Sequence, residues 1–266
     1  PLWPPTWSGL GAGVDNAVRS MAVHDDGDGP ALFVGGQFFS AGGVPAQRVA
    51  KWDMTSWSAL GSGMDGTVLG FTTFDDGGGP ALYACGQFTT AGGVPCNRVA
   101  KWDGSAWPPL SGGLIGDTRA LAVFDAGQGP ALFAGGFFAS ADGLPVQCIA
   151  SWSGAGWSTL GTGADGWVRS LAVFDDGDGP ALYAGGEFKM IGGVAAYGIA
   201  RWDGSSWSAL GDGIFPQDVQ SLAVYDDGDG PALYAGGNFV WAGGVTVLGT
   251  ARWDGTSWSA LGSGMP

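Results

Sequence analysis

A unit of about 50 residues occurs five times along the chain, and this repetition limits the fold more than any other feature. A segment that starts with Ala-Leu and ends in Phe, with a glycine-rich pair between, begins at residues 31, 81, 131, 181 and 232. Each copy also carries two tryptophans five residues apart: Trp52 and Trp57, Trp102 and Trp107, Trp152 and Trp157, Trp202 and Trp207, Trp253 and Trp258. Self-similarity at this period is typical of solenoids and propellers, whose units bury their apolar faces against one another.

Each unit is predicted to contain four short strands. In the fourth copy these cover residues 168–174, 181–186, 198–202 and 206–210. An Asp-Asp-Gly-Asp-Gly-Pro turn separates the first two strands, and Asp-Gly-Ser separates the last two. No segment shows a capped 3.6-residue apolar period, so no helix is expected.

The distribution of small and large side chains predicts how such units pack. The first two strands are apolar on both faces, as expected for a sheet that lies between two similar sheets. The glycine pair of the second strand, such as Gly35 and Gly36, suits a crowded centre, whereas the tryptophans suit a wide periphery. We therefore expect residues 1–266 to form one all-β domain, a five-bladed β-propeller of four-stranded antiparallel blades.

The outer-strand motif occurs once more than the inner strands, at residues 6–13 and again at 257–264. One terminal copy could complete the last blade from the other end of the chain and so close the ring. The other copy would then be surplus or would pair with another molecule through its strand edge. A third alternative is that the chain is cut from a longer array. The sequence begins at Pro1 without a charged and then apolar leader, so a signal peptide is either absent or already removed.

Two motifs carry a resemblance to known repeats. They are Gly-Gly-Gln-Phe at 35–38 with Ala-Gly-Gly-Val at 41–44, and Ala-Arg-Trp-Asp-Gly at 251–255. The glycine pair and the tryptophan hairpin resemble kelch and galactose-oxidase-type propellers, although the tryptophan spacing departs from the kelch pattern. The chain is more similar to extracellular repeats of bacterial surface proteins and of fungal cortical cell-polarity markers. The resemblance implies a propeller in a secreted or cell-surface protein and implies little about chemistry.

Charge and hydropathy narrow the expected partners. The chain has 24 acidic and 10 basic side chains and a net charge of −14, which disfavours nucleic acids and anionic lipid surfaces. No apolar run approaches the roughly 20 residues of a transmembrane helix, so no membrane span is expected. Proteins or polysaccharides are therefore the expected ligands.

Catalysis is not expected. The single histidine, His24, stands where the other copies have Phe or Tyr, so a Ser-His-Asp triad or a three-histidine metal site is not predicted. The aspartates recur in turns and do not gather in one unique cleft, as glycoside hydrolysis would require. We predict a non-enzymatic scaffold that binds a protein or polymer. The alternative is a carbohydrate-binding lectin with repeated sites between the blades.

Two tryptophans are the candidate ligand-binding residues. Trp167 and Trp241 lie outside the repeated pairs and are expected in exposed loops, where aromatic faces can stack on a ligand. The ten paired tryptophans are interpreted as packing between blades.

The aspartate-rich turns are candidate calcium sites. The carboxylates concerned are Asp25, Asp26, Asp28, Asp175, Asp176, Asp178, Asp226, Asp227 and Asp229. Calcium prefers six to eight oxygen ligands, usually with a bidentate carboxylate further along the chain, and no such glutamate follows. Plain hairpin turns are therefore the favoured interpretation and weak calcium binding the alternative. The recurring cations Lys51, Lys101, Arg201 and Arg252 are expected to pair with aspartates of these turns.

Three cysteines, Cys85, Cys96 and Cys148, allow at most one internal disulfide. A bridge between Cys96 and Cys148 is one hypothesis, with Cys85 as a small buried apolar side chain.

Overall fold

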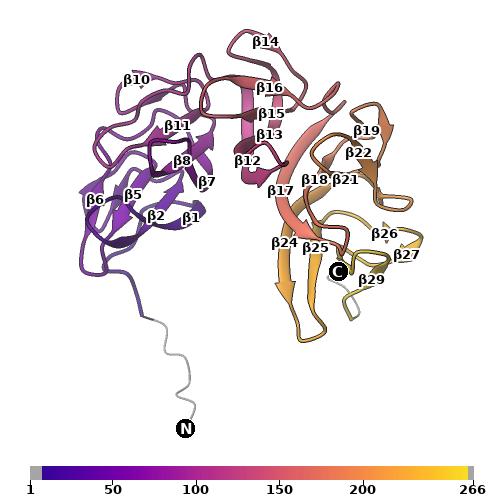
Figure 1. Ribbon diagram of the computed structural model, residues 1–266. Coiled ribbons are helices and arrows are strands. Elements are labelled where there is room, and N and C mark those ends of the chain that lie inside the picture. Colours follow the sequence, from indigo (N-terminus) through magenta and orange to yellow (C-terminus); the bar gives the residue numbers. More distant parts are fainter. Residues whose placement is uncertain (1–7, 263–266) are drawn as a thin grey trace. The chain divides into compact units, whose positions relative to one another are not determined.

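The computed structural model describes residues 8–262 and is built from β-strands, without a helix in that range. This confirms the all-β prediction, and the described part of the chain accordingly has no helix that could cross a membrane. Contacts group the chain into two compact units. Unit 1 extends to Thr73 and takes in Pro80–Leu110, and unit 2 takes in Phe74–Gly79 and the chain from Ser111 onward. Figure 1 follows the strands of each unit.

Unit 2 contains three large sheets, each an antiparallel meander in chain order. The third sheet of the chain comprises β12 (Leu114–Asp125), β13 (Pro130–Ala141), β15 (Ile149–Trp152) and β16 (Trp157–Thr159). The fourth comprises β17 (Trp167–Asp175), β18 (Pro180–Glu187), β21 (Ile199–Trp202) and β22 (Trp207–Ala209). The fifth comprises β24 (Val219–Asp226), β25 (Pro231–Gly237), β28 (Thr250–Trp253) and β29 (Trp258–Ala260). The four predicted strands of the fourth copy are each confirmed to within one residue at either end.

Unit 1 holds the first sheet and the second sheet apart from Phe74 and Asp75, the last residues of its first strand. The first comprises β1 (Val18–Asp25), β2 (Pro30–Gly36), β5 (Val49–Trp52) and β6 (Trp57–Ala59), and the second comprises β7 (Val68–Asp75), β8 (Pro80–Gly86) and β11 (Val99–Trp102). The second sheet has only a single bridge, from Ala100 to Pro109, where the others have a fourth strand. Pro108 and Pro109 occupy this segment, and proline has no N–H to donate to a ladder.

Small hairpins that sequence patterning does not predict flank the large sheets. Their strands are two residues long: β3 (Ser40–Ala41) with β4 (Val44–Pro45), β9 (Thr90–Ala91) with β10 (Val94–Pro95), β19 (Met190–Ile191) with β20 (Val194–Ala195), and β26 (Trp241–Ala242) with β27 (Val245–Thr246). In the third copy, β14 (Leu144–Pro145) pairs with the extended β13. In the fifth, β23 (Ile214–Phe215) pairs with β26. Strands this short carry too few residues for a detectable alternation.

The first strands of neighbouring sheets lie against one another inside each unit. In unit 2, β12 contacts β17, and β17 contacts β24. The hydroxyl of Ser170 accepts the N–H of Leu222 at 2.9 Å, and in unit 1 the hydroxyl of Ser20 accepts the N–H of Phe71 at 3.1 Å. In these two cases the first strand of one sheet is joined to the first strand of the next sheet of the same unit.

The glycine pairs allow this close packing of sheets. A Cβ added to Gly185 would lie 2.7 Å from Cγ1 of Val219, and one added to Gly35 would lie 2.5 Å from Cγ1 of Val68. Both distances are shorter than a carbon–carbon contact, so a larger residue would push the next sheet away. The predicted role of the glycines is confirmed within each unit.

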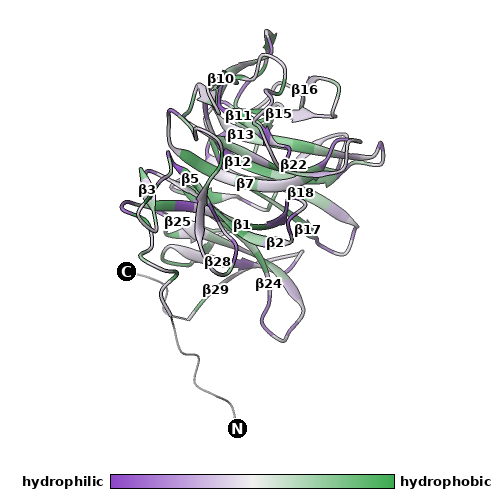
Figure 2. Ribbon diagram, turned by 90° about the vertical axis from the view of Figure 1, so that its left-hand side faces the viewer, coloured by the Kyte–Doolittle hydropathy of each residue, from purple (hydrophilic) through white to green (hydrophobic). Residues whose placement is uncertain are grey.

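The tryptophan pairs lie at the opposite, outer side of each sheet. Each pair faces across the hairpin of the third and fourth strands, with ring centroids 5.1 Å apart for Trp102 and Trp107. The indole N–H of the second tryptophan reaches a leucine carbonyl of the preceding repeat; the pairs are Trp57 with Leu10, Trp107 with Leu60, Trp207 with Leu160, and Trp258 with Leu210. Figure 2 shows hydrophobic colour concentrated in the strands and hydrophilic colour in the turns.

The terminal copies of the outer-strand motif differ in their surroundings. The C-terminal copy supplies β29, which pairs with β28 in the fifth sheet. Of the N-terminal copy, Leu10 accepts the Trp57 indole N–H at 2.8 Å, whereas Trp7 lies outside the described residues. The fifth sheet therefore takes its fourth strand from its own end of the chain.

Candidate functional site

The two ends of each large sheet carry different side chains. One end holds the aspartate-rich hairpin, as Asp175 paired with Pro180 illustrates, and the other end holds the start of the first strand and the end of the second. In unit 2 this second end, here called the apolar end, presents exposed apolar residues: Ile115, Phe137, Met190, Tyr197, Phe215, Val240, Trp241 and Leu248. The asymmetry marks the apolar end as the candidate binding surface.

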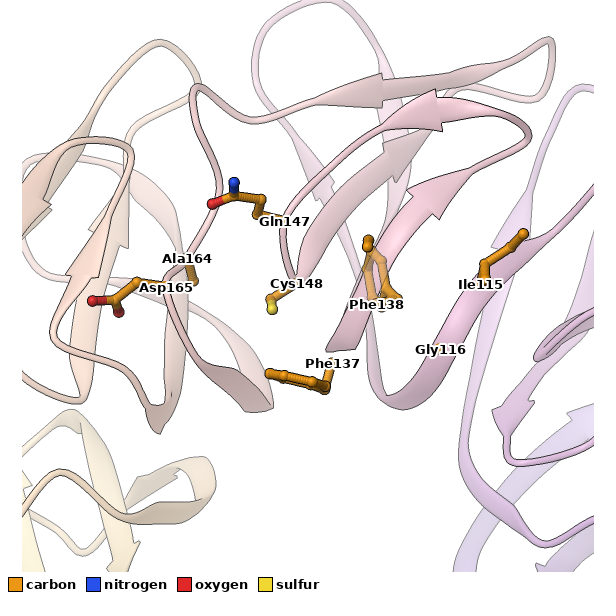
Figure 3. A pocket seen from close by; sticks show the side chains of 9 residues that line it. Ile115, Gly116, Phe137, Phe138, Gln147, Cys148, Ala164 and Asp165 are labelled. Carbon is orange, nitrogen blue, oxygen red and sulfur yellow. The ribbon is translucent and has the colours of Figure 1, made fainter.

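A pocket of about 430 Å³ opens at the apolar end of the third sheet. Phe138, Cys148 and Ala164 are its buried lining residues, while Phe137 and Ile115 are exposed. Figure 3 shows the Cys148 sulfur directed toward the Phe137 ring, with Gln147 on the opposite side of the hollow. This volume falls within the range of roughly 300–1,000 Å³ that small-ligand sites occupy.

Departures from the repeat create the pocket. The side chain at position 137 is Phe, whereas the corresponding residues are Gln37, Gln87, Glu187 and Asn238. The side chain at 148 is Cys, whereas the corresponding residues are Arg48, Arg98, Gly198 and Gly249. The recurring residues of the repeat do not predict this site. The detectable signal was the apolar Phe137 in place of a polar residue, eleven positions before a site where the third, fourth and fifth copies lack the arginine of the first two.

Trp167 packs against Phe137, one of the residues that line this pocket. It is the first residue of β17, and its ring stacks on Phe137 with centroids 5.0 Å apart and planes at 23°. The guanidinium of Arg119 lies 4.6 Å from the Trp167 ring, and that of Arg169 lies 5.4 Å away. The expectation of an exposed loop residue is therefore wrong for Trp167, because it is a half-buried strand residue held between neighbours.

Trp241 is the more exposed of the two candidate tryptophans, at 48% of its surface. It begins β26 and pairs in register with Phe215 of β23, which is 61% exposed. These two aromatic residues form an aromatic platform at the apolar end of the fifth sheet. The structure thus places Trp167 and Trp241 in different sheets.

The aspartates of the hairpin turns have partners within the protein. The first of each turn caps the backbone: Asp175 accepts the N–H groups of Gly177 and Gly179 at 2.9 and 3.1 Å. The second forms an ion pair, as Asp26 does with Lys51 at 2.5 Å and Asp176 with Arg201 at 2.7 Å. Arg252 lies 3.4 Å from Asp227 in the same way, so the predicted pairing with turn aspartates is confirmed for Lys51, Arg201 and Arg252.

Calcium does not fit these turns well. Among residues 8–262, no three His, Cys, Asp or Glu side chains converge as a metal site would require. Burial raises the pKa of Asp26, but the hydrogen bonds from Lys51 and Trp102 lower it by a larger amount. The net shift of the pKa is therefore downward. A carboxylate so engaged would have to exchange these partners for the metal. Calcium binding stays a prediction.

The remaining candidate groups are buried. His24 lies against Phe33 with ring centroids 5.7 Å apart, and burial lowers its pKa. This fits an aromatic substitute in the core. All three cysteines are buried free thiols, so the hypothetical bridge between Cys96 and Cys148 is not formed in this structure. Burial raises the pKa of the Cys96 thiol to about 12.

No family model and no curated protein matches the chain. Two crystal structures of the extracellular domain of one protein of B. thetaiotaomicron, BT4673, are similar to it, at TM-scores of 0.53 and 0.51 with 11% and 12% sequence identity. One describes that protein as a one component system, the other as a hybrid two component system. The match covers 89% of this chain and 27% of the other chain.

At this identity the similarity concerns the fold. It agrees with the sheets described above and places the chain in a class: all-β proteins of repeated antiparallel sheets, the architecture from which propellers are assembled.

Proposed function

We propose that this protein is a non-enzymatic extracellular binding domain, a five-bladed β-propeller whose apolar end binds a protein or polymer. The observation that carries the proposal is the contrast between the two ends of the sheets in unit 2. Most of the exposed aromatic and aliphatic side chains gather at one end and the paired aspartates at the other, where Val224 and Tyr225 of β24 are the exposed apolar residues. Exposed apolar patches on soluble proteins are typical of interaction sites.

An extracellular location is supported by the structural neighbours, which are extracellular domains of a B. thetaiotaomicron protein. The repeats resemble surface-protein repeats, which supports the same location.

The proposal of five blades in one closed domain is supported by one uncovered sheet face within each unit, that of the first sheet in unit 1 and that of the fifth sheet in unit 2. Val18 of β1 is 40% exposed, whereas the residues at the corresponding position are fully buried: Val68, Val168 and Val219. A Cβ on Gly236 of β25 would meet only the Ser221 hydroxyl of its own sheet within 4 Å. Gly35 and Gly185 face a valine of the next sheet at this position. Closure would place the fifth sheet against Val18 and cover both faces.

The absence of enzymatic activity is proposed from the same residues. The one histidine is buried against Phe33, and the second aspartates of the turns are bound to basic side chains. A general base needs to reach substrate within hydrogen-bond distance, and these groups are directed inward.

A lectin is the second candidate function, and the exposed Trp241–Phe215 platform favours it. Sugars stack on exposed indole faces, and repeated weak sites can act together through multivalency.

The test is binding of the purified chain to a glycan array and to a peptide array, with Trp241→Ala and a matched Asp229→Asn variant at the acidic end. The proposal expects peptide binding that is weakened by the first substitution and unchanged by the second. Binding to glycans alone would establish the lectin instead, and binding lost only with Asp229→Asn would contradict the apolar end as the site.

A further inference from the structure

We propose that the pocket of the third sheet binds an arginine side chain of a partner polypeptide. This rests on the proposed function and names the chemistry of the partner at one site. The first repeat of the same chain shows which side chain occupies the corresponding hollow when no partner is needed.

In the first repeat the hollow is filled by Arg48. Its guanidinium donates to the carbonyl oxygen of Met64 at 2.9 Å and lies 4.8 Å from the ring centroid of Phe39. An arginine of this chain thus combines stacking on a phenylalanine with a hydrogen bond to the link that leads into the next sheet. All three residues belong to unit 1.

The third repeat keeps the backbone of this hollow and removes its occupant, and its exposed phenylalanine stands two positions earlier, as Phe137, with Ala139 in place of Phe39. Cys148 takes the place of Arg48 and has the same backbone conformation, with φ of 62° against 63°. Its N–H donates to Phe138 at 2.9 Å, just as the Arg48 N–H donates to Phe38 at 2.9 Å. Ala164 corresponds to Met64, and its carbonyl is the predicted acceptor. The side chain ends at the sulfur, so the space of the guanidinium is left open.

The lining of the pocket suits an arginine. The methylene stem can pack on Phe138 and Cys148, and the guanidinium can stack on the exposed face of Phe137. Phe137 is held in place by its stacking on Trp167. The planar guanidinium also needs acceptors, which the Ala164 carbonyl and the Gln147 amide oxygen provide. The net charge of −14 attracts a basic partner.

A sugar fits this pocket less well. Only Gln147 and Asp165 contribute polar side chains to the lining. Asp165 accepts the N–H groups of Lys189 and Met190 at 2.8 and 2.9 Å, and Figure 3 shows its carboxylate turned away from Phe137. Saccharide recognition requires several hydrogen-bonding groups around the stacking ring, and the pocket offers few.

The first experiment measures binding of N-acetyl-arginine amide by chemical-shift titration. N-acetyl-citrulline amide, an uncharged isostere, is the ligand control. We expect the arginine probe to bind at least about tenfold more tightly, since one charged hydrogen bond with stacking accounts for that ratio. Equal binding of the two probes would overturn the proposal.

Two substitutions test whether the arginine probe binds in the pocket. Cys148→Arg supplies the side chain from within the protein and should abolish probe binding without lowering the melting temperature, because positions 48 and 98 carry arginine in similar backbone conformations. Phe137→Gln, which introduces the residue of the first two copies, should weaken binding about tenfold. Asn238→Gln is the matched control at the corresponding position of the fifth sheet. Unchanged binding by Cys148→Arg would contradict the proposal.

A second measurement concerns Arg48, the side chain that fills the corresponding hollow in the first repeat. Arg48→Ala should lower the melting temperature, and the arginine probe should raise it again more than it raises that of the unaltered protein, since a ligand of the native state stabilises it. If the arginine probe fails to raise the melting temperature of Arg48→Ala in this way, Arg48 does not represent the ligand of the third-sheet pocket. Failure of these tests with peptide binding at Trp241 retained would refute this inference and leave the proposed function intact.

Discussion

The indole N–H of Trp102 donates to the carboxylate of Asp26 across 3.2 Å, which joins the second sheet to the hairpin turn of the first. Lys51 pairs with the same carboxylate at 2.5 Å, and the Asp26 side chain is only 4% exposed. A turn aspartate that looks solvating in the sequence is therefore a buried link between sheets.

Asp26→Ala is expected to destabilise unit 1 by about 2 kcal/mol, because Lys51 and Trp102 lose a buried acceptor. The third repeat lacks both charges and has Ala126 and Ser151 at the corresponding positions. The double variant Asp26→Ala with Lys51→Ser should thus recover part of the loss, since removing both partners of a buried pair costs less than removing one. Urea denaturation measures the free energy of unfolding of the single and double variants. If the losses from the two substitutions simply add, the pairing of Asp26 with Lys51 does not stabilise the fold.

His24 should make stability depend on mildly acidic pH. Burial lowers its pKa from 6.5, so the unfolded chain binds the proton more readily than the folded chain. The contribution to stability is present above about pH 6.5 and is lost as the pH falls toward the lowered value. His24→Phe, which introduces the residue of the second to fourth copies, should remove this slope. Melting temperatures of the unaltered protein and of His24→Phe, measured from neutral pH down to below pH 6.5, test this expectation. The same dependence of melting temperature on pH in both proteins would refute it.

Alanine substitutions at the adjacent glycines Gly42 and Gly43 distinguish the cost of backbone strain from the cost of a steric clash. Both have positive φ, of 60° and 82°, so alanine costs about 1 kcal/mol of strain at either position. A Cβ on Gly42 would also lie 2.5 Å from Cδ1 of Trp57, whereas one on Gly43 meets nothing within 4 Å. We expect Gly42→Ala to cost roughly 2 kcal/mol more than Gly43→Ala. Equal losses in chemical denaturation would show that Trp57 is not packed against this turn.

The two terminal copies of the outer-strand motif should substitute for each other if the ring is closed. Trp258 of β29 donates to Leu210, and residues 6–13 carry the same motif and lead into the first sheet. In a closed ring both copies compete for the fourth strand of the closing blade. Deleting either 1–8 or 257–266 should therefore cost less than about 1 kcal/mol, whereas deleting both should cost at least about 3 kcal/mol, as loss of a buried tryptophan does. Additive effects of the two deletions would contradict this competition.

The repeat predicted most of the secondary structure, because each copy supports the interpretation of the others. Turn residues set the strand limits, and the glycine pair and tryptophans set which strands pack closely. The sequence did not reveal the extension of β12 and β13, which follows from Ile115 in place of a capping aspartate such as Asp65.

The candidate site could be predicted only in part. Trp241 was found because it departs from the pattern and is exposed. Trp167 was found for the same reason, but its environment depends on Phe137 and Arg119 of another sheet, which no local pattern encodes. The pocket itself depends on a backbone carbonyl and on the absence of a side chain at Cys148. Neither is visible until the repeats are superimposed in space.

Closure of the five sheets into one ring is tested most directly by pulsed electron-spin distance measurements. Spin labels at Asp28→Cys and Asp229→Cys mark equivalent hairpin tips of the first and fifth sheets, and labels at Asp178→Cys and Asp229→Cys mark those of two adjacent sheets. The three native thiols are buried, so the introduced ones label selectively. A closed ring predicts the same distance for both pairs, whereas a clearly longer or broader distribution for the first pair would contradict it.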